Sequence, residues 1–257
     1  MLDFPKQSDQ DVPIFTAADM LAYRQRVHPV PKIPPPHTVI VGYQRDSMAT
    51  LLKRYRATKV TGFFGDLRLL KTHPRSIGVL HPVGPGAPIV AAVLEELIAF
   101  GVQRFISIGL AGGLQPDLRA GDVVVCDRAL RDEGTSYHYL PPARSVDADS
   151  ALVQQIRAAL TVRGIAHVSG VSWTTDAPYR ETRREVEKYR AEDVKTVEME
   201  AAALFAVGQR LKAATAAVVV ISDRLADLTW QPPPDSRLQQ QRLGVVAEAI
   251  IDALGRE

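Results

Sequence analysis

From residue 38 onward, short runs of β-branched and other apolar residues alternate with longer segments in which apolar residues recur at helical spacing. The predicted strands lie at 38–41, 76–80, 104–108, 122–125 and 214–221. The predicted helices lie at 47–55, 87–100, 149–163, 181–189, 200–211 and 239–254. Strands that are apolar along their whole length must be covered on both faces, and the helices between them provide that cover. The pattern therefore predicts a single α/β domain with a central mixed, mostly parallel, twisted sheet and helices on both of its faces.

The first 37 residues differ in composition from the rest of the chain. They hold seven of the 18 prolines and end in a run of three at 34–36. Thr16 followed by Asp19 is typical of a helix N-terminus, and it predicts a short helix over about 16–25. We therefore predict an N-terminal Pro-rich arm over 1–37, either packed on a surface or disordered, and a globular domain over 38–257.

Composition excludes several classes of protein. The net charge is +2, from 31 basic and 29 acidic residues, which gives no reason to expect a nucleic acid or an anionic membrane as partner. The single cysteine, Cys126, cannot form an intramolecular disulfide. The sequence shows no signal peptide and no apolar run near the ~18 residues that a membrane helix needs. No Cys/His cluster has the spacing of metal ligands, so we expect a cytoplasmic protein without a metal site.

Small and polar residues follow the first, third and fifth predicted strands at their carboxyl ends. They are Gly42 to Arg45, a glycine-rich turn from Gly109 to Gly113, and Ser222 with Asp223. Ligands of open α/β sheets bind in the crevice outside the carboxyl ends of the strands. We therefore expect these three segments to line one pocket.

Two glutamates flank a methionine immediately before the apolar segment 201–207. Both glutamates can be explained by a helix first turn, where the helix dipole favours carboxylates. The segment after them is apolar on most sides and predicts a buried helix. A carboxylate at the N-terminus of a buried helix requires hydrogen-bond partners. Sugar hydroxyls are suitable partners for Glu198 and Glu200, and Met199 can cover the face of a furanose. The segment therefore favours recognition of a ribose.

Asp223 closes the most apolar of the predicted strands. An aspartate in this position commonly caps the next helix. Arg237, fourteen residues further on, can return to it across the intervening loop. Held between Ser222 and Arg237, Asp223 is suited to donate a proton or a hydrogen bond to a heterocycle nitrogen.

These motifs together resemble those of the nucleoside phosphorylase superfamily, which includes purine nucleoside phosphorylases, uridine phosphorylases and methylthioadenosine nucleosidases. The resemblance covers residues 38–254, and its most specific part is Val-Glu-Met-Glu-Ala-Ala at 197–202. Gly-Pro-Gly-Ala-Pro at 84–88, Ile-Gly-Leu-Ala-Gly-Gly at 108–113 and Ser-Asp at 222–223 support it. It implies that Glu200 binds the ribose 2′- and 3′-hydroxyls, that Met199 packs on the sugar, and that Glu198 supports the base side.

For the base, the resemblance implies that Asp223 protonates or hydrogen-bonds a purine at N7, with Arg237 as its helper. The base-binding residues that it implies are Tyr179, Arg184 and Ser222. Uridine phosphorylases read their base with a Gln and an Arg, where this chain has Thr182 and Arg184. Because only half of that pair is present, the resemblance favours a purine.

For phosphate, the resemblance implies binding by Gly42, Arg45 and Gly109, and by Arg54 or Arg56 reaching the site of a neighbouring subunit. Relatives also carry an Arg in the strand before the glycine-rich turn and a Ser or Thr within the turn, where this chain has Ser107 and Leu110. Loss of a guanidinium that binds an anion through two hydrogen bonds is a large change. Nucleosidases activate water with a glutamate after the first glycine, and the nearest group here is Asp46.

The activity that the resemblance implies is that of a nucleoside phosphorylase, a pentosyltransferase. It would cleave the N-glycosidic bond of a ribonucleoside, with a purine favoured, giving free base and ribose 1-phosphate. Phosphate would be the co-substrate and no cofactor would be needed. The alternatives are a nucleosidase that uses water, a uridine phosphorylase, and a nucleoside-binding protein without turnover. The resemblance also implies a homo-oligomer, a dimer or a hexamer, with His28 as a candidate contact to the 5′-hydroxyl across the interface.

Overall fold

A computed structural model of the chain describes residues 12–27, 33–61, 66–71, 76–81, 83–233 and 235–255. The strands are β1 (Thr38–Gly42), β2 (Thr58–Val60), β3 (Leu67–Leu69), β4 (Ile77–Leu80), β5 (Arg104–Gly113), β6 (Val123–Asp132), β7 (Ser145–Asp147), β8 (Val168–Thr175), β9 (Thr196–Glu198) and β10 (Ala214–Arg224). The α-helices are α1 (Ala17–Val27), α2 (Arg45–Arg54), α3 (Ala87–Phe100), α4 (Ser150–Val162), α5 (Arg183–Ala191), α6 (Ala201–Leu211) and α7 (Arg237–Leu254). Two 3₁₀-helices are η1 (Ser136–His138) and η2 (Pro178–Arg180).

The strands form one mixed sheet with the order β10-β6-β8-β9-β5-β1-β4-β3-β2, and β7 pairs with β6. β10 also pairs with β5, so that β5, β10, β6, β8 and β9 close into a ring. β4, β1, β5 and β10 run parallel to one another, and their carboxyl ends therefore meet at one edge of the sheet. This architecture confirms the predicted α/β domain with a central mixed sheet. Parallel pairing joins the four strands that carry the candidate site and also joins β8 to β6 and β9.

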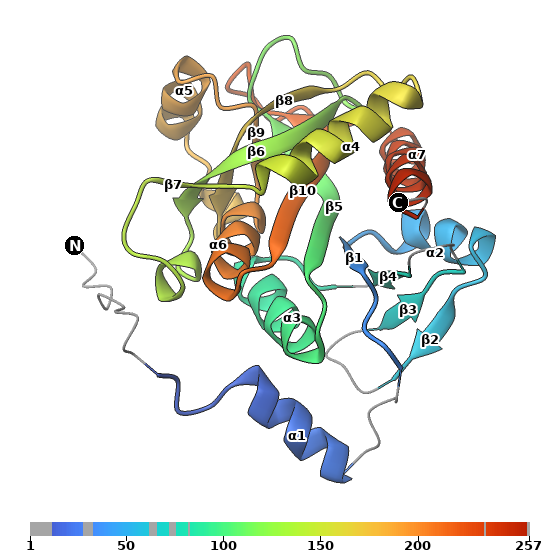
Figure 1. Cartoon of the computed structure of the whole chain (residues 1–257). Helices are drawn as coiled ribbons and strands as arrows, with labels where there is room; N and C mark the ends of the chain where they lie inside the picture. Colours follow the sequence, from blue (N-terminus) through green and yellow to red (C-terminus); the bar gives the residue numbers. More distant parts are fainter. Residues whose placement is uncertain are drawn as a thin grey trace.

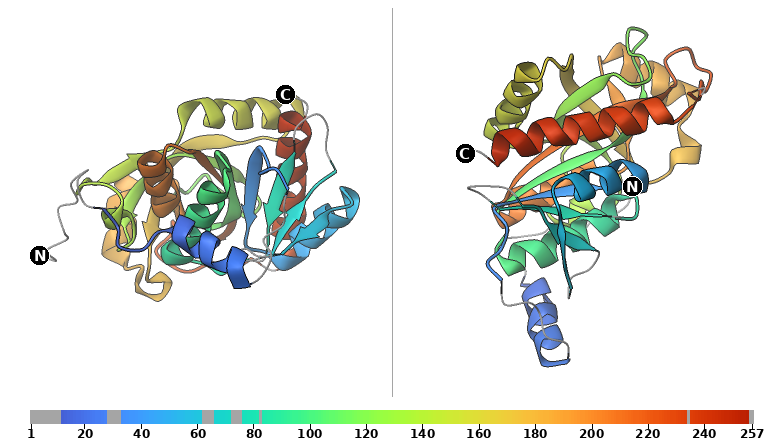
Figure 2. Two further views of the ribbon diagram at one scale, coloured as in Figure 1. Left: turned by 60° about the horizontal axis from the view of Figure 1, so that its bottom comes forward. Right: turned by 90° about the vertical axis from the view of Figure 1, so that its right-hand side faces the viewer.

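Helices cover both faces of this sheet (Figure 1, Figure 2). α3 and α6 pack on one face, where Phe105 of β5 and Phe205 of α6 belong to the same buried cluster. α2, α4 and α7 cover the other face, where Ile106 of β5 joins Met48 and Ile250. Successive residues of a strand point to opposite faces, so the apolar run 104–108 can fill both layers only in this arrangement.

The glycine-rich segment forms part of a strand, and its prediction as a turn is wrong. β5 continues to Gly113, with Gly109 opposite Val219 and Gly112 opposite Asp223 of β10. A Cβ atom on Gly112 would meet the Val197 side chain at 3.0 Å and the Leu225 side chain at 3.1 Å. Glycine avoids crowding here, because β9 and the chain after β10 approach the backbone closely. Ser222 and Asp223 also lie inside a strand, after a register shift between Ile221 and Asp223.

The described part of the N-terminal arm packs on the domain. α1 begins after Thr16, whose hydroxyl accepts a hydrogen bond from the Asp19 backbone N–H at 3.2 Å, as the helix prediction required. Arg24 of α1 pairs with Glu96 of α3 at 2.7 Å, which fixes the helix against the sheet-covering layer. Residues 1–11 and 28–32, which include His28, lie outside the described residues. The boundary between residues 37 and 38 stays a prediction.

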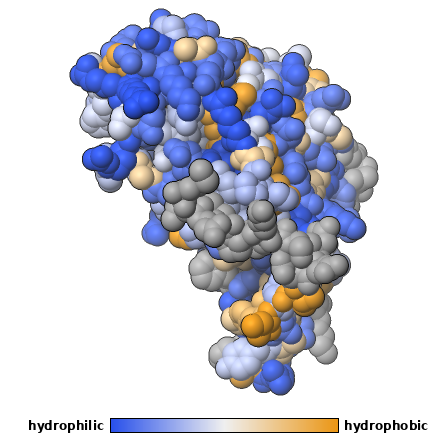
Figure 3. All heavy atoms as spheres, turned by 90° about the vertical axis from the view of Figure 1, so that its left-hand side faces the viewer, coloured by the Kyte–Doolittle hydropathy of each residue, from blue (hydrophilic) through white to orange (hydrophobic). Residues whose placement is uncertain are grey.

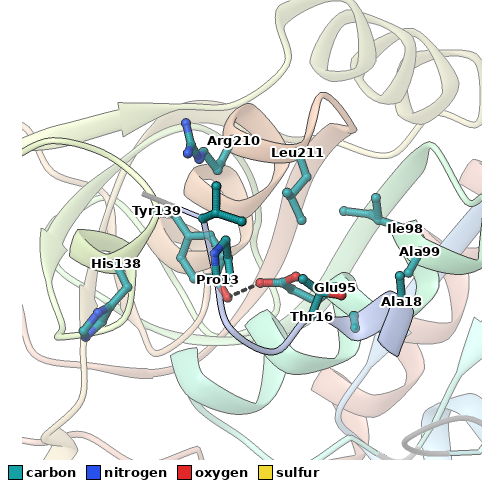
Figure 4. A pocket seen from close by; sticks show the side chains of 12 residues that line it. Pro13, Thr16, Ala18, Glu95, Ile98, Ala99, His138, Tyr139, Arg210 and Leu211 are labelled. Atoms are coloured by element: carbon teal, nitrogen blue, oxygen red, sulfur yellow. Dashed lines mark hydrogen bonds between the residues drawn. The ribbon is translucent and has the colours of Figure 1, made fainter. Parts of the chain in front are cut away.

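A hollow of about 670 Å³ lies beside this arm, away from the carboxyl ends of the strands (Figure 4). Residues 12–18 form one wall, and α3, η1 and the end of α6 form the others. The Tyr139 hydroxyl donates a hydrogen bond to Glu95 at 2.9 Å across it. None of the helices in the described part of the chain is long and apolar enough to cross a membrane.

Candidate functional site

The candidate site lies along the edge where β4, β1, β5 and β10 end. In that order, His81 follows β4, Tyr43 follows β1, Gly109 lies in β5 and Asp223 lies in β10. Neighbouring strands are about 4.8 Å apart, so the edge from β4 to β10 spans roughly 14 Å. That length is sufficient for a base, a sugar and an anion placed side by side.

Glu198 is a buried carboxylate whose two oxygens are both bound by protein donors. Its Oε1 accepts hydrogen bonds from the hydroxyls of Thr174 at 2.6 Å and Ser172 at 3.2 Å. Its Oε2 accepts from the backbone N–H groups of Glu200 at 2.8 Å and Ala201 at 2.7 Å. Burial raises the pKa of Glu198, and these four donors oppose the shift. Glu198 therefore holds the start of α6 and positions Glu200, and its expected support of the base side stays a prediction.

Glu200 lies at the N-terminus of α6 and is also buried, with 8% of its surface exposed. Its Oε1 accepts a hydrogen bond from the backbone N–H of Gly86 at 2.6 Å. Gly86 has a φ of 107°, a conformation that favours glycine, and it precedes α3. Burial and then the charge of Glu198 raise the pKa of Glu200 well above its usual value. Met199, between the two glutamates, is partly exposed and remains available to a ligand.

A hollow of about 490 Å³ opens at the β10 end of the edge. Its lining residues are Gly112, Pro178, Tyr179, Glu181, Val197, Asp223, Leu225 and Trp230. Asp223 accepts hydrogen bonds from the Ser222 hydroxyl and, at 2.9 Å, from the indole N–H of Trp230. Tyr179 is 98% exposed at its rim. The hollow combines aromatic surface with a carboxylate, which suits a planar heterocycle.

The predicted pairing of Arg237 with Asp223 is wrong. Arg237 donates to Asp235 at 2.6 Å, and 84% of its side chain is exposed. Asp235 is two residues away in sequence, so this local pair costs less chain ordering than a return across the loop. Trp230, from within that loop, donates to Asp223 instead.

Arg184 does not belong to the residues that line the hollow. It is exposed in the first turn of α5, where Thr182 forms a capping box with Glu185.

Glu181 is a residue of the hollow that the sequence interpretation missed. Burial, followed by the charges of Asp223 and Glu185, raises its pKa to about 7. A carboxyl group that holds its proton near neutral pH can donate a hydrogen bond to a base. Its position before the Thr182 cap identified it only as a helix-start residue, because the sequence does not show that the chain turns Glu181 toward Asp223.

The edge beside Glu200 carries hydroxyl groups, from Tyr43 after β1 and from Ser107 within β5. The Tyr43 hydroxyl lies 3.1 Å from the Ser107 hydroxyl. Burial, followed by the charge of Glu200, raises the pKa of Tyr43. A Cβ atom on Gly109 would meet the Tyr43 ring at 3.1 Å, and one on Gly42 would meet Met48 at 2.9 Å. Close packing therefore accounts for both glycines that were predicted to bind phosphate.

Arg45 and Arg56 lie together, although not beside Gly109. Both line a second hollow of about 590 Å³ between α2 and the strands β3 and β4. The neighbouring Arg54, which was the other candidate in this region, donates to Glu248 of α7 at 2.9 Å. Within the described ranges, no group of three or more His, Cys, Asp or Glu residues is arranged to hold a metal ion.

Comparison with known proteins identifies the family. The family model of the Phosphorylase superfamily matches residues 48–254. The chain belongs to this superfamily. It is 33% identical over 149 residues to uridine phosphorylase of Treponema pallidum, which covers 54% of this chain and 58% of the relative. It is 28% identical over 190 residues to uridine phosphorylase of Salmonella typhimurium, covering 67% and 73% respectively.

Other members of the Phosphorylase superfamily carry a different name or have a solved structure. Guanosine phosphorylase of Halorubrum lacusprofundi is 33% identical over 143 residues, which cover 55% of this chain and 59% of that protein. The fold matches the crystal structure of uridine phosphorylase from Vibrio fischeri ES114 with a TM-score of 0.74. That match covers 87% of this chain and 92% of the other at 22% identity, and it supports the fold alone.

In this superfamily member, the structure gathers part of the predicted site along one edge. Met199 and Glu200 follow β9, Ser222 and Asp223 lie within β10, and Tyr179 lies in the loop that lines the same hollow as Asp223. Their roles toward a ligand stay predictions.

Proposed function

We propose that this chain is a nucleoside phosphorylase that cleaves the N-glycosidic bond of a ribonucleoside with phosphate. The observation that carries the proposal is that the buried Glu200 carboxylate has acceptor positions left for a ligand. A carboxylate has about four acceptor positions, and the backbone N–H of Gly86 occupies one of them in Glu200, at 2.6 Å. The positions that remain can accept hydrogen bonds from the 2′- and 3′-hydroxyls of a ribose.

The chemistry follows from the order of groups along the sheet edge. With the base in the hollow at Asp223 and the ribose on Met199 and Glu200, the far side of the sugar faces β1. Positive charge develops on the sugar ring as the bond to the base breaks, and the contact of Glu200 with the 2′-hydroxyl strengthens as it does. Asp223 receives hydrogen bonds from Ser222 and Trp230, which orient it toward the leaving base. A general acid in that position typically contributes ~10²–10⁴-fold.

For the base we propose a purine. Support comes from Asp223 and Glu181, two carboxyl groups that flank one hollow and can pair with the nitrogens and amino group of a purine. Similar proteins are named uridine phosphorylase and guanosine phosphorylase, so the name of a relative does not choose between the two classes. A pyrimidine is therefore the alternative outcome of the test.

Hydrolysis is the second candidate, and the pair of Tyr43 and Ser107 favours it. Their hydroxyls lie 3.1 Å apart beside Glu200, in a place where a phosphorylase needs positive charge. Hydroxyl groups can hold a water molecule as well as they hold phosphate.

The test is base release from guanosine, inosine, uridine and cytidine, followed by liquid chromatography, with and without phosphate. We expect release from the purine nucleosides that depends on phosphate. Release from uridine alone would reverse the base assignment, and equal rates without phosphate would establish hydrolysis. No release from any of the four would contradict the proposed function, and tight nucleoside binding without release would indicate a binding protein.

The homo-oligomer and the cytoplasmic location also stay proposals. Exposed apolar side chains gather on the arm and on α1, at the lower end of the face in Figure 3. They are Val12, Ile14, Phe15, Tyr23 and Val27. Exposed apolar side chains that gather in one region commonly mark an interface, and size-exclusion chromatography with light scattering tests the expected dimer or hexamer.

A further inference from the structure

The N-terminus of α6 is capped by side chains from two strands. Glu200 occupies the N-cap position, and its own side chain makes no capping hydrogen bond to the helix. The backbone N–H groups of Glu200 and Ala201 donate to Glu198, at the end of β9, at 2.8 Å and 2.7 Å. The backbone N–H of Ala202 donates to the hydroxyl of Thr174, in β8, at 3.0 Å. The first N–H groups of a helix have no partner within it, so β8 and β9 provide the partners here.

Thr174 connects the two parts of this cap. Its hydroxyl donates to Oε1 of Glu198 at 2.6 Å and accepts from the Ala202 N–H. A hydroxyl has one donor and two acceptor lone pairs, so it makes both bonds at once. The register of the sheet places Thr174 opposite Glu198, and the residue is fully buried. Bulk water therefore does not compete for either bond.

A second pair of buried hydroxyls contacts Glu198 without contacting the helix. The Ser172 hydroxyl donates to Oε1 of Glu198 at 3.2 Å, and the Thr196 hydroxyl donates to Ser172 at 2.9 Å. Among the residues that the structure describes, no hydrogen bond joins either hydroxyl to α6. Support of Glu198 and capping of Ala202 are therefore separable, because only Thr174 does both.

The bond from Ala202 to Thr174 affects Glu200. An N-cap side chain ordinarily accepts the N–H of the second or third helical residue, and Ala202 is the second residue after Glu200. Because Thr174 accepts that N–H, the Glu200 carboxylate is not needed there. Its Oε1 instead accepts from the backbone N–H of Gly86 at 2.6 Å, in the segment between β4 and α3. The carboxylate is thus directed along the candidate site rather than back onto its own helix.

We propose that Thr174 is a positioning residue for ribose recognition, because it occupies the helix N–H that would otherwise draw the Glu200 carboxylate onto α6. This proposal rests on the proposed function and extends it to the class of sugar. Without the Thr174 hydroxyl, Glu200 turns an acceptor position to the Ala202 N–H, and that position is lost to the sugar. A 2′-deoxyribonucleoside has no 2′-hydroxyl to lose, so the preference for ribonucleosides over 2′-deoxyribonucleosides depends on Thr174.

The first experiment measures kcat/KM for a ribonucleoside and for its 2′-deoxy counterpart, with the base that the nucleoside panel selects. Thr174→Val removes the hydroxyl and nearly keeps the shape of the side chain, and Thr174→Ser keeps the hydroxyl. We expect the ratio of the two kcat/KM values to fall by about fivefold or more in Thr174→Val, the equivalent of one hydrogen bond. Thr174→Ser should keep the wild-type ratio within about twofold. An equal loss on both substrates in Thr174→Val, or no loss at all, would overturn the proposal.

Two control variants separate the cap from general packing. Thr215→Val changes an equally buried threonine at the start of β10, away from the carboxyl ends of the strands, and should keep the ratio. Ser172→Ala removes a donor to Glu198 but leaves the partner of the Ala202 N–H, and it should also keep the ratio. A fall in Ser172→Ala equal to that in Thr174→Val would show that the effect passes through Glu198 alone, against the proposal.

If Thr174→Val does not fold, Thr174→Cys takes its place and is compared with Thr174→Ser. Both variants lack the threonine methyl group, and they differ in that a thiol is a weak hydrogen-bond partner. The ratio should be lower in Thr174→Cys than in Thr174→Ser, and equal ratios would contradict the role of the hydroxyl.

The second experiment does not depend on turnover. A crystal structure of Thr174→Val, or of Thr174→Cys, should show a Glu200 carboxylate oxygen within about 3.2 Å of the Ala202 nitrogen. A Glu200 side chain that keeps its wild-type position would overturn the proposal. If wild type releases no base from any nucleoside but Glu200 moves onto Ala202 in the variant, the proposed function fails and the control of Glu200 by Thr174 stands.

Discussion

Removal of the Glu198 carboxylate should destabilise the start of α6. Glu198→Ala deletes the acceptor for the backbone N–H groups of Glu200 and Ala201 and for the hydroxyls of Thr174 and Ser172. The two hydroxyls can rotate toward other acceptors. The two backbone groups cannot, because they belong to the first residues of the helix and have no intrahelical partner.

The size of the stability loss in Glu198→Ala follows from those two backbone N–H groups. Each buried donor left without a partner costs about 1–3 kcal/mol, so the pair costs about 2–6 kcal/mol. Burial raises the pKa of Glu198, which shows that burying its charge costs free energy. Glu198→Ala removes this charge, and the gain offsets part of the cost of the two unpartnered N–H groups. We expect Glu198→Ala to lower the free energy of unfolding by about 2–4 kcal/mol, against a total of 5–15 kcal/mol for a typical domain. Glu198→Gln keeps one oxygen for the backbone groups and should cost about 1 kcal/mol.

Urea unfolding followed by circular dichroism at pH 7.5 measures this loss of stability. The slope of the unfolding free energy against urea concentration should be the same in all variants, which verifies that they unfold by the same transition. Glu187→Ala, at an exposed position of α5, is the control and should stay within about 0.5 kcal/mol of wild type. If Glu198→Ala also stays within about 0.5 kcal/mol, the view that Glu198 anchors α6 is wrong.

Three further predictions concern the base hollow. Because the pKa of Glu181 is raised to about 7, the carboxyl carries its proton below that pH and loses it above. The affinity for a free base should therefore fall in wild type as pH rises through about 7, and it should not change with pH in Glu181→Gln. Isothermal titration measures both, and the same dependence of affinity on pH in the two proteins would refute a role for the Glu181 proton. Asp223→Asn should lower kcat by ~10²–10⁴ with little change in nucleoside Kd, and unchanged turnover would remove Asp223 from the chemistry. Trp230→Phe keeps the ring but loses the N–H donor to Asp223, so kcat should fall by about tenfold, the equivalent of one hydrogen bond of roughly 1.4 kcal/mol; wild-type kcat would show that the bond does not position Asp223.

Local signals explain why the helices could be predicted from the sequence. α3 was predicted at 87–100 and is found at Ala87–Phe100, because Gly86 precedes it and Gly101, with a φ of 115°, ends it. The apolar residues after Glu200 likewise predicted a helix that the structure buries on all sides from Ala201 to Gly208. These signals lie within a few residues of the feature that they determine.

Pairings between distant segments could not be predicted in the same way. β5 extends through the glycines because β10 and β9 lie beside them, and nothing in the segment itself shows those neighbours. Glu181 approaches Asp223 through the fold, whereas Arg237 was assigned to Asp223 from charge, spacing and the resemblance and meets Asp235 instead. The hollow that Arg45 and Arg56 line could not be predicted for the same reason, since Lys53 and Arg68 come together only when α2 packs beside β3.

The most direct test of phosphorolysis is the stoichiometry of products from one nucleoside. The enzyme is incubated with guanosine and phosphate, free base is measured by liquid chromatography, and the sugar product is measured by ³¹P nuclear magnetic resonance. Phosphorolysis predicts one ribose 1-phosphate for each base released, and no release when phosphate is omitted. Release of base with free ribose, at a rate that phosphate does not change, would contradict it.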